Sequence, residues 1–233
     1  MPNYKNLFLR QSYLDSYVEY ESSLKMDKYP LWDYIILTAS NEAQAEFYRL
    51  QIKKRIESGK LPAQTHYAVL PDPDGKRVGS GGATLNVLRY IANHRGSDDF
   101  RGLKILCIHS GGDSKRVPQY SACGKLFSPV PRELGDGRRS TLFDEFIIGM
   151  TGVPARMADG MLVCSGDVLL LFNSLQLDFY TNGAMALSIK ENVQTGKNHG
   201  VFLGDDEATL RDFCISRAWK PLKRMARLIR IIT

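Results

Sequence analysis

The chain has 233 residues, of which 43% are apolar, and this length and composition are typical of a globular α/β protein of one or two domains. The formal net charge of +6 comes from residues 213–233, which hold six basic residues and no acidic one. Because the rest is formally neutral and lacks a basic patch interleaved with aromatic residues, nucleic-acid binding is not expected. The sequence has neither a transmembrane run nor a signal-peptide core, so we expect no membrane association and a cytoplasmic location.

The first predicted elements alternate between helix and strand. Residues 1–30 are polar and rich in tyrosine, and they predict a leading helical segment. Trp32–Thr38 is rich in β-branched and aromatic residues, which predicts a strand. A helix is predicted to begin at Asn41, with Gln44 placed as in a capping box, and to end at Gly59. Its expected apolar face consists of Phe47, Leu50 and Ile56.

Each of the next two predicted strands leads to a glycine-rich stretch. His66–Leu70 is followed by a turn and then by Val78-Gly-Ser-Gly-Gly-Ala-Thr84, which feeds a helix expected to bury Leu85, Leu88 and Ile91. Leu103–His109 is followed at once by Ser110-Gly-Gly-Asp-Ser-Lys-Arg116. Glycine lets backbone N–H groups approach an anion closely, and a helix N-terminus adds a favourable dipole. Both stretches are therefore candidate phosphate-binding segments.

The second half continues the alternation. Ser140 is expected to cap a helix, and Met161–Cys164 is a strand that ends in Ser165-Gly-Asp167. Two further strands are predicted at Ala184–Ile189 and Gly200–Leu203. This order predicts an α/β fold with a mainly parallel sheet and helices on both faces. Both glycine-rich stretches and Asp167 follow strands, and the carboxyl ends of parallel strands form the ligand crevice.

The first glycine-rich stretch contains Gly79, Ser80, Gly81 and Gly82. It departs from the dinucleotide fingerprint at its sixth position, which is Thr84, and no Gly-Lys-Ser/Thr follows as in a Walker loop. Two interpretations stay equally open from these residues alone. One is a phosphate or nucleobase cradle, and the other is a tight turn before a helix.

For three charged residues, a role in phosphoryl transfer is favoured over a position on the solvent-exposed surface without a function. Arg116 and Lys125 follow the second glycine-rich stretch, where positive charge would stabilise a leaving pyrophosphate. Asp167 ends a buried strand, where a carboxylate can hold Mg²⁺ against phosphate oxygens. The alternatives are a basic surface loop for Arg116 and Lys125, and an ordinary Ser-Gly-Asp turn for Asp167.

Histidine and cysteine residues suggest no separate catalytic site. His109 ends a strand beside the second glycine-rich stretch and can contact a ligand, but a satisfied structural histidine is the favoured interpretation. The four cysteines lack a CxxC spacing, and Cys107 and Cys164 lie inside predicted strands. Free buried thiols are favoured over disulfides or a zinc site.

Taken together, the motifs resemble the GDP-fucose pyrophosphorylase and L-fucokinase family, within the wider sugar-nucleotide pyrophosphorylases. The resemblance covers roughly residues 30–212 and rests on six segments: Ile36–Ser40, Gly79–Leu85, Ile108–Arg116, Gly124–Pro131, Leu162–Asp167 and Gly204–Glu207. It implies a Rossmann-like, GT-A-like nucleotidyltransferase domain over residues 31–212 that is C-terminally incomplete. Residues 213–233 are then a basic tail of atypical composition, and no kinase domain is expected.

The resemblance also implies a reaction, in which GMP is transferred from GTP to L-fucose 1-phosphate with Mg²⁺, giving GDP-L-fucose and pyrophosphate. By position, Arg116 would stabilise the leaving pyrophosphate, Lys125 would neutralise the α-phosphate or the sugar phosphate, and Asp167 would hold the metal. Nucleotide binding would also involve residues of the second glycine-rich stretch: Gly111, Gly112, Asp113, Ser114 and Lys115.

The sequence departs from the wider pyrophosphorylase signature at two points. Ser114 and Lys115 stand where that signature has Gly-Thr, and Gly124 stands where it has proline. Two alternative functions stay open: an L-fucokinase that phosphorylates L-fucose with ATP, and a remnant that binds nucleotide without turnover. For the basic tail, a truncated or frame-shifted end is favoured over a surface helix that binds a membrane or a partner protein.

Overall fold

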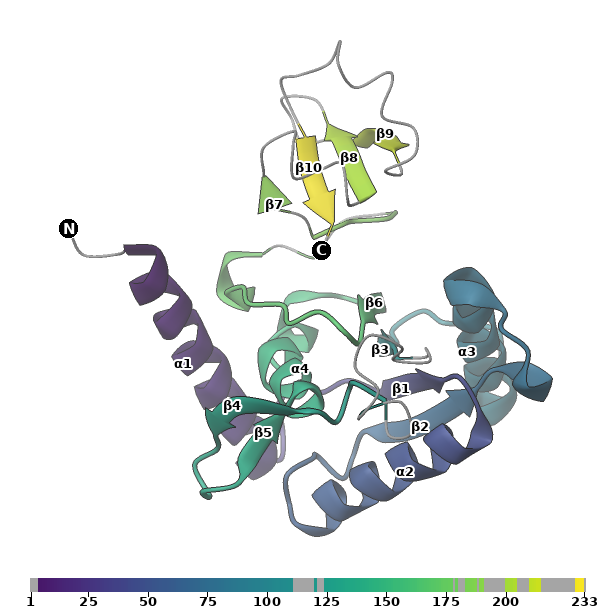
Figure 1. The fold of residues 1–233 in the computed structure, drawn as a ribbon, viewed down its shortest axis with the longest axis horizontal. Helices are drawn as coiled ribbons and strands as arrows, with labels where there is room; N and C mark the ends of the chain where they lie inside the picture. Colours follow the sequence, from purple (N-terminus) through teal and green to yellow (C-terminus); the bar gives the residue numbers. More distant parts are fainter. Residues whose placement is uncertain are drawn as a thin grey trace. The chain divides into compact units, whose positions relative to one another are not determined.

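The computed structural model describes residues 4–110, 120, 124–177, 179, 183–187, 189–190, 200–204, 210–214 and 229–232. The chain divides into two compact units, Met1–Tyr180 and Thr181–Thr233. The first unit contains the α/β sheet with its helices, and the second contains a small antiparallel sheet (Figure 1). The domain boundaries predicted from sequence stay predictions.

The first unit is built on a four-stranded parallel sheet with the order β2-β1-β3-β6. Its strands are β1 (Tyr34–Ala39), β2 (His66–Pro71), β3 (Lys104–His109) and β6 (Gly160–Ser165). All six residues of β1 are buried, as expected for a central strand covered on both faces. The register places Thr38 beside His109 and His109 beside Ser165, so three strands end at one edge. The predicted mainly parallel sheet is confirmed.

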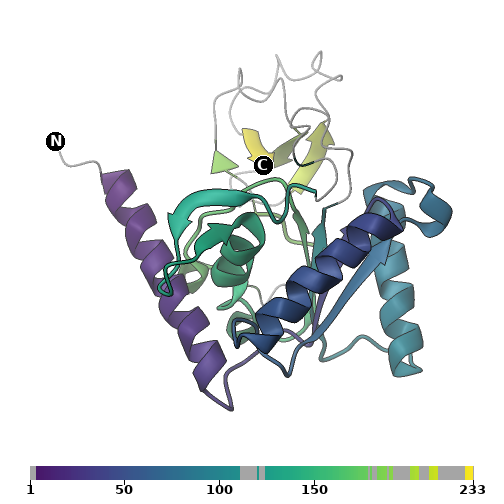
Figure 2. The same ribbon diagram turned by 60° about the horizontal axis from the view of Figure 1, so that its bottom comes forward.

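Helices cover both faces of this sheet, as Figures 1 and 2 show. On one face, α2 (Glu42–Glu57) and α4 (Leu142–Met150) bury Tyr48, Ile52 and Phe143 in the larger core. On the other face, α3 (Gly79–Arg95) buries Val87 and Ile91 against β1 and β3. The predicted α/β arrangement with helices on both faces therefore holds.

The remaining elements of the first unit complete its surface. The helix α1 (Tyr4–Lys25) packs along α4, which confirms helix in the leading segment. A short antiparallel ribbon joins β4 (Pro129–Glu133) to β5 (Arg139–Thr141). Single 3-10 turns lie at Pro73–Gly75 (η1), Pro154–Arg156 (η3) and Ser174–Gln176 (η4).

Helix boundaries differ from the predicted ones where the backbone turns sharply. Helix α3 begins at Gly79, so the first glycine-rich stretch is the first turn of the helix and not a loop before it. Gly79 has a φ of 72°, which glycine adopts without strain and which lets the chain turn from η1 into the helix. Helix α4 is capped by Thr141 and not by Ser140, because the Thr141 side chain accepts from the Asp144 N–H and the Asp144 side chain accepts from the Thr141 N–H, whereas the fully buried Ser140 hydroxyl donates to Glu145.

The predicted apolar faces of α2 and α3 are partly wrong. Leu50 is 45% exposed and Leu85 is 68% exposed, whereas Phe47 and Ile56 pack against the larger core and Ile91 is fully buried as predicted. The buried side of α2 also includes Tyr48 and Arg55, whose polar atoms have partners inside the protein. A count of apolar residues alone misses such positions.

The second unit is an antiparallel sheet with the order β7-β10-β8-β9. Its strands are β7 (Ile189–Lys190), β8 (Gly200–Gly204), β9 (Leu210–Cys214) and β10 (Ile229–Ile232). The strand predicted at Gly200–Leu203 is confirmed, whereas residues 184–187 are not in a strand. Because β10 lies in the basic tail, the surface-helix alternative is wrong for its four residues.

Candidate functional site

A pocket lies at the carboxyl edge of the parallel sheet, between β1 and β3. The chain passes from β1 to β2 on one side and then returns to place β3 on the other side, so this edge is the topological switch point where such sheets bind ligands. The pocket has a volume of about 370 Å³. Its lining comes from the strand ends and the start of α3: Thr38, Ala39, Asp72, Arg77, Gly79, Ser80, Ala83 and His109.

The pocket presents one carboxylate and one guanidinium group. Burial raises the pKa of Asp72 above its ordinary value, although the backbone N–H of Val78 and the positive charge of Arg77 oppose that shift. Asp72 follows β2 directly, and Arg77 precedes α3. A ligand in the pocket therefore meets a hydrogen-bond acceptor and a charged donor within a few residues of chain.

His109 holds two hydroxyl groups on opposite sides of its ring. Its Nδ1 atom lies 3.3 Å from Oγ1 of Thr38, and its Nε2 atom lies 2.9 Å from Oγ1 of Thr84. Burial lowers the pKa of His109 below 6.5, and the nearby carboxylate of Asp72 only partly opposes this. The side chain is therefore a satisfied neutral histidine, as favoured from the sequence, and it also lines the pocket.

Lys125 and Asp167 meet at the same edge of the sheet. The Lys125 Nζ atom lies 3.6 Å from Oδ2 of Asp167, and the two side chains are 36% and 53% exposed. The hydroxyl of Ser165 donates to Oδ1 of Asp167 at 2.7 Å. An exposed ion pair of this kind contributes little to stability, so either partner can bind phosphate or a metal at small cost.

The close contact between β3 and β6 fixes the position of Asp167. The N–H of Gly166 donates to the carbonyl oxygen of His109 at 2.7 Å. A Cβ atom at residue 166 would lie 2.8 Å from Cβ of Ser110 and 3.1 Å from the His109 oxygen. Only glycine fits there without moving a strand, so Gly166 has a packing role that the sequence did not reveal.

Tyr48 of α2 contacts both ends of the segment that runs from residue 110 to residue 124. The hydroxyl of Ser110 donates to the phenol oxygen of Tyr48 at 2.8 Å. Gly124 has a φ of 69°, and a Cβ atom there would lie only 2.0 Å from the same phenol oxygen. The fully buried Tyr48 thus fixes the backbone immediately before Lys125.

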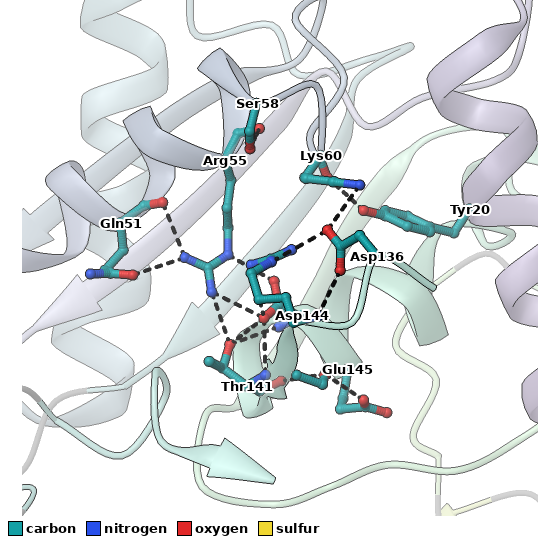
Figure 3. Close-up of polar contacts among 11 residues, drawn as sticks. Tyr20, Gln51, Arg55, Ser58, Lys60, Asp136, Thr141, Asp144 and Glu145 are labelled. Carbon is teal, nitrogen blue, oxygen red and sulfur yellow. Dashed lines mark hydrogen bonds and ion pairs between the residues drawn. The ribbon is translucent and has the colours of Figure 1, made fainter. Parts of the chain in front are cut away.

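A buried polar network supports the segment after Lys125 (Figure 3). The Arg55 guanidinium donates to both carboxylate oxygens of Asp144, at 2.7 and 3.0 Å, and to the hydroxyl of Thr141 at 3.2 Å. The guanidinium carbon also lies 5.1 Å from the ring centre of Phe127 and 5.5 Å from that of Phe143. Burial alone would raise the pKa of Asp144, but the hydrogen bonds and charge of Arg55 outweigh it and hold that pKa low.

The predicted site residues fall into two groups. Lys125, Asp167, Gly79 and Ser80 lie at the carboxyl edge, and Gly81 and Gly82 complete the first turn of α3. The other predicted residues lie outside the described part of the chain: Gly111, Gly112, Asp113, Ser114, Lys115 and Arg116. Sequence reasoning missed five residues of the site, of which only Thr38 and Asp72 stand at or just after a strand end: Thr38, Tyr48, Asp72, Arg77 and Thr84.

The donors at this edge fit a magnesium ion bound together with substrate. Within the described ranges, no group of three or more His, Cys, Asp or Glu side chains is placed to hold a metal. Mg²⁺ commonly takes one or two protein carboxylates and completes its shell with phosphate oxygens and water, so Asp167 alone suffices on the protein side.

Cys107 and Cys164 are buried and free, and burial raises the pKa of each thiol to about 12.

Comparisons with known proteins identify the family. Residues 97–226 match the model described as the fucose pyrophosphorylase domain. The chain belongs to the fucose pyrophosphorylase family. The matched range includes β3, Lys125 and Asp167, and the resemblance inferred from the motifs is confirmed. No solved structure matches the chain.

Curated relatives carry names of related activities. The chain is 31% identical over 207 residues to a bifunctional fucokinase/GDP-fucose pyrophosphorylase of Arabidopsis thaliana, covering 78% of this chain and 20% of that protein. It is 35% identical over 184 residues to a fucose-1-phosphate guanylyltransferase of Mus musculus, covering 77% of this chain and 30% of that protein. The Homo sapiens protein of the same name is 34% identical, with 78% and 30% covered. The chain spans 20–30% of the length of these relatives.

No helix in the described ranges is long and apolar enough to cross a membrane.

Proposed function

We propose that the chain is the nucleotide-binding part of a cytoplasmic fucose-1-phosphate guanylyltransferase, which transfers GMP from GTP to L-fucose 1-phosphate. The observation that carries this proposal is the meeting of the Lys125–Asp167 pair and the pocket at one edge of the sheet. The names of the relatives support the same reaction. Free buried thiols at Cys107 and Cys164 fit a reducing compartment.

The proposed reaction needs positioning and charge neutralisation more than a covalent intermediate. A phosphate oxygen of the sugar phosphate attacks the α-phosphorus of GTP, and the bond to the β-phosphate oxygen breaks, releasing pyrophosphate. The dianionic sugar phosphate needs no general base. Lys125 supplies positive charge beside the reacting phosphates, and Asp167 would hold Mg²⁺, which neutralises phosphate oxygens when bound.

The pocket chemistry supports guanine as the base. Guanine presents N1–H and an exocyclic amino group as neighbouring donors, which a carboxylate such as Asp72 accepts well. Adenine presents an unprotonated N1 acceptor at that edge, which a carboxylate repels. Arg77 supplies donors of the kind that bind the O6 and N7 acceptors of guanine. The α3 N-terminus at Gly79 lies in the same pocket and favours negative charge.

Calorimetry with the purified chain, Mg²⁺ and GTP, ATP or UTP tests the binding part of the proposal. We expect GTP to bind most tightly and Asp167→Asn to weaken the Mg²⁺-dependent component. Release of pyrophosphate on adding L-fucose 1-phosphate would establish turnover. Phosphorylation of free L-fucose by ATP would instead favour the fucokinase alternative, and GTP binding without pyrophosphate release would favour the remnant. Equal or absent binding of all three nucleotides would contradict the proposal.

A further inference from the structure

A continuous chain of hydrogen bonds connects the two glycine-rich stretches through His109. The N–H of Ser110, which begins the second stretch, donates to Oγ1 of Thr38 at 3.3 Å. That hydroxyl lies 3.3 Å from Nδ1 of His109, and Nε2 of the same ring lies 2.9 Å from Oγ1 of Thr84. The hydroxyl of Thr84 in turn donates to the carbonyl oxygen of Ser80 at 2.9 Å. The connection thus spans β3, β1 and the first turn of α3.

The direction of these bonds determines the protonation of the ring. Because the Thr84 hydroxyl proton is used on the Ser80 carbonyl, Nε2 of His109 must be the donor to Thr84. Nδ1 is then unprotonated and accepts from the Thr38 hydroxyl, whose oxygen receives the Ser110 N–H. Every donor has one acceptor only when His109 is neutral with its proton on Nε2.

We propose that neutral His109 is a positioning residue that couples the first turn of α3 to the end of β3, so that this turn and Ser110 are preorganised for one nucleotide. This inference rests on the proposed function for its ligand, whereas the coupling itself is a property of the unliganded chain. Preorganised sites bind more tightly because less ordering remains to be done on binding. His109 acts through the two threonines and need not touch the nucleotide.

A second histidine provides a matched comparison for a purely structural role. His66 of β2 also bonds to α3, with its Nε2 atom 3.0 Å from the hydroxyl of Tyr90. Burial and the neighbouring His94 lower the pKa of His66 as well. Neither His66 nor Tyr90 lines the pocket. If His109 only attached α3 to the sheet, loss of either bond would have the same effect.

Protonation should weaken the coupling, because a protonated Nδ1 must donate to Oγ1 of Thr38, and the Thr38 hydroxyl proton then loses its acceptor. Among the described residues, the ionisable and charged groups near the ring are Asp72 and Arg77, which line the same pocket, and Cys107, whose Sγ atom lies 3.9 Å from Nε2. All three stay unchanged in the variants below. A difference between wild type and a His109 variant in the pH dependence of GTP affinity therefore arises from the titration of His109. Titration of the GTP phosphates affects both proteins equally and does not contribute to the difference.

The first experiment measures the dissociation constant of GTP for wild type, His109→Gln, Thr84→Val and Tyr90→Phe between pH 5.5 and 8. We expect affinity about threefold to tenfold weaker for His109→Gln and Thr84→Val at pH 7.5, the size of one lost hydrogen bond. Tyr90→Phe should match wild type. Wild type and Tyr90→Phe should lose additional affinity below pH 6.5, and His109→Gln should not. Equal losses in all three variants would overturn the proposal.

The second experiment needs no nucleotide and separates this inference from the proposed function. Amide hydrogen exchange is followed over residues 79–84 in the same four proteins. We expect faster exchange there in His109→Gln and Thr84→Val, and wild-type exchange in Tyr90→Phe. Unchanged exchange in His109→Gln would overturn the coupling even if GTP binds. Faster exchange in a chain that fails to bind GTP would keep the coupling and reject the proposed ligand.

Discussion

Replacing Arg55 by methionine should destabilise the first unit strongly. Arg55 and Asp144 are both buried, with exposures of 5% and 7%, and they share two hydrogen bonds. The variant removes the cation and leaves the carboxylate buried without its main partner. Removing one member of a buried, hydrogen-bonded pair typically costs about 3–5 kcal/mol. For a unit of this size, that loss corresponds to a fall in Tm of roughly 6–20 °C.

Urea unfolding followed by the fluorescence of buried Trp32 measures this loss. Arg49→Met is the matched control, because Arg49 lies on the same helix and forms its ion pairs with Glu42 and Glu46 at the surface. That control should stay within about 1 kcal/mol of wild type. A loss below about 1 kcal/mol for Arg55→Met would refute the view that this network supports the fold.

The pH dependence of the same variant gives an independent check. In the wild type the pKa of Asp144 is below that of the unfolded chain, so its contribution to stability is complete above about pH 4 and disappears as the pH falls further. In Arg55→Met, burial raises that pKa, and protonation then relieves the unpaired charge. The variant should therefore gain stability relative to wild type between pH 6 and pH 4. Parallel curves for the two proteins would contradict this reasoning.

Three further outcomes concern the site. In a protein that catalyses the reaction, Lys125→Ala and Asp167→Asn should each lower kcat/KM for GTP by a factor that corresponds to a loss of about 2–4 kcal/mol in transition-state stabilisation. An unchanged kcat/KM would show that the residue takes no part in the reaction. Asp72→Asn should reduce the preference for GTP over inosine triphosphate, which lacks the 2-amino group, and competition calorimetry showing an unaltered ratio would exclude Asp72 from base recognition. Gly124→Ala should destabilise the chain by at least 1 kcal/mol, because of its positive φ and its contact with Tyr48, whereas Gly137→Ala shares the positive φ but has open space around it and should cost less.

The sequence predicted the strands of the parallel sheet well, because their cores are short apolar runs bounded by polar turns. It also indicated that the glycine-rich stretches and Asp167 would share one edge, since parallel strands end on the same side. The order of the strands could not be predicted, because no local sequence feature shows that β2 and β3 lie on opposite sides of β1. Roles for residues 111–116 stay predictions, since they lie outside the described part of the chain.

The partners of the site side chains were equally inaccessible to sequence reasoning. His109 forms hydrogen bonds with Thr38 and Thr84, and Arg55 forms them with Asp144. These residues are far apart in the sequence and come together only in the folded chain. The helix faces were misjudged for a related reason. Arg55 and Tyr48 occupy interior positions because their polar atoms have partners there, and hydrophobic periodicity cannot anticipate such pairs.

The missing side chain at Gly166 limits how this site can be redesigned. Asp167 can be exchanged for another oxygen or nitrogen donor without disturbing the strands, because that side chain projects toward solvent. The donor cannot be moved one position earlier, because any Cβ at residue 166 collides with Ser110 and the His109 backbone. Engineering of the proposed metal site therefore has to exchange the donor at residue 167, whose distance from the sheet the main chain already sets.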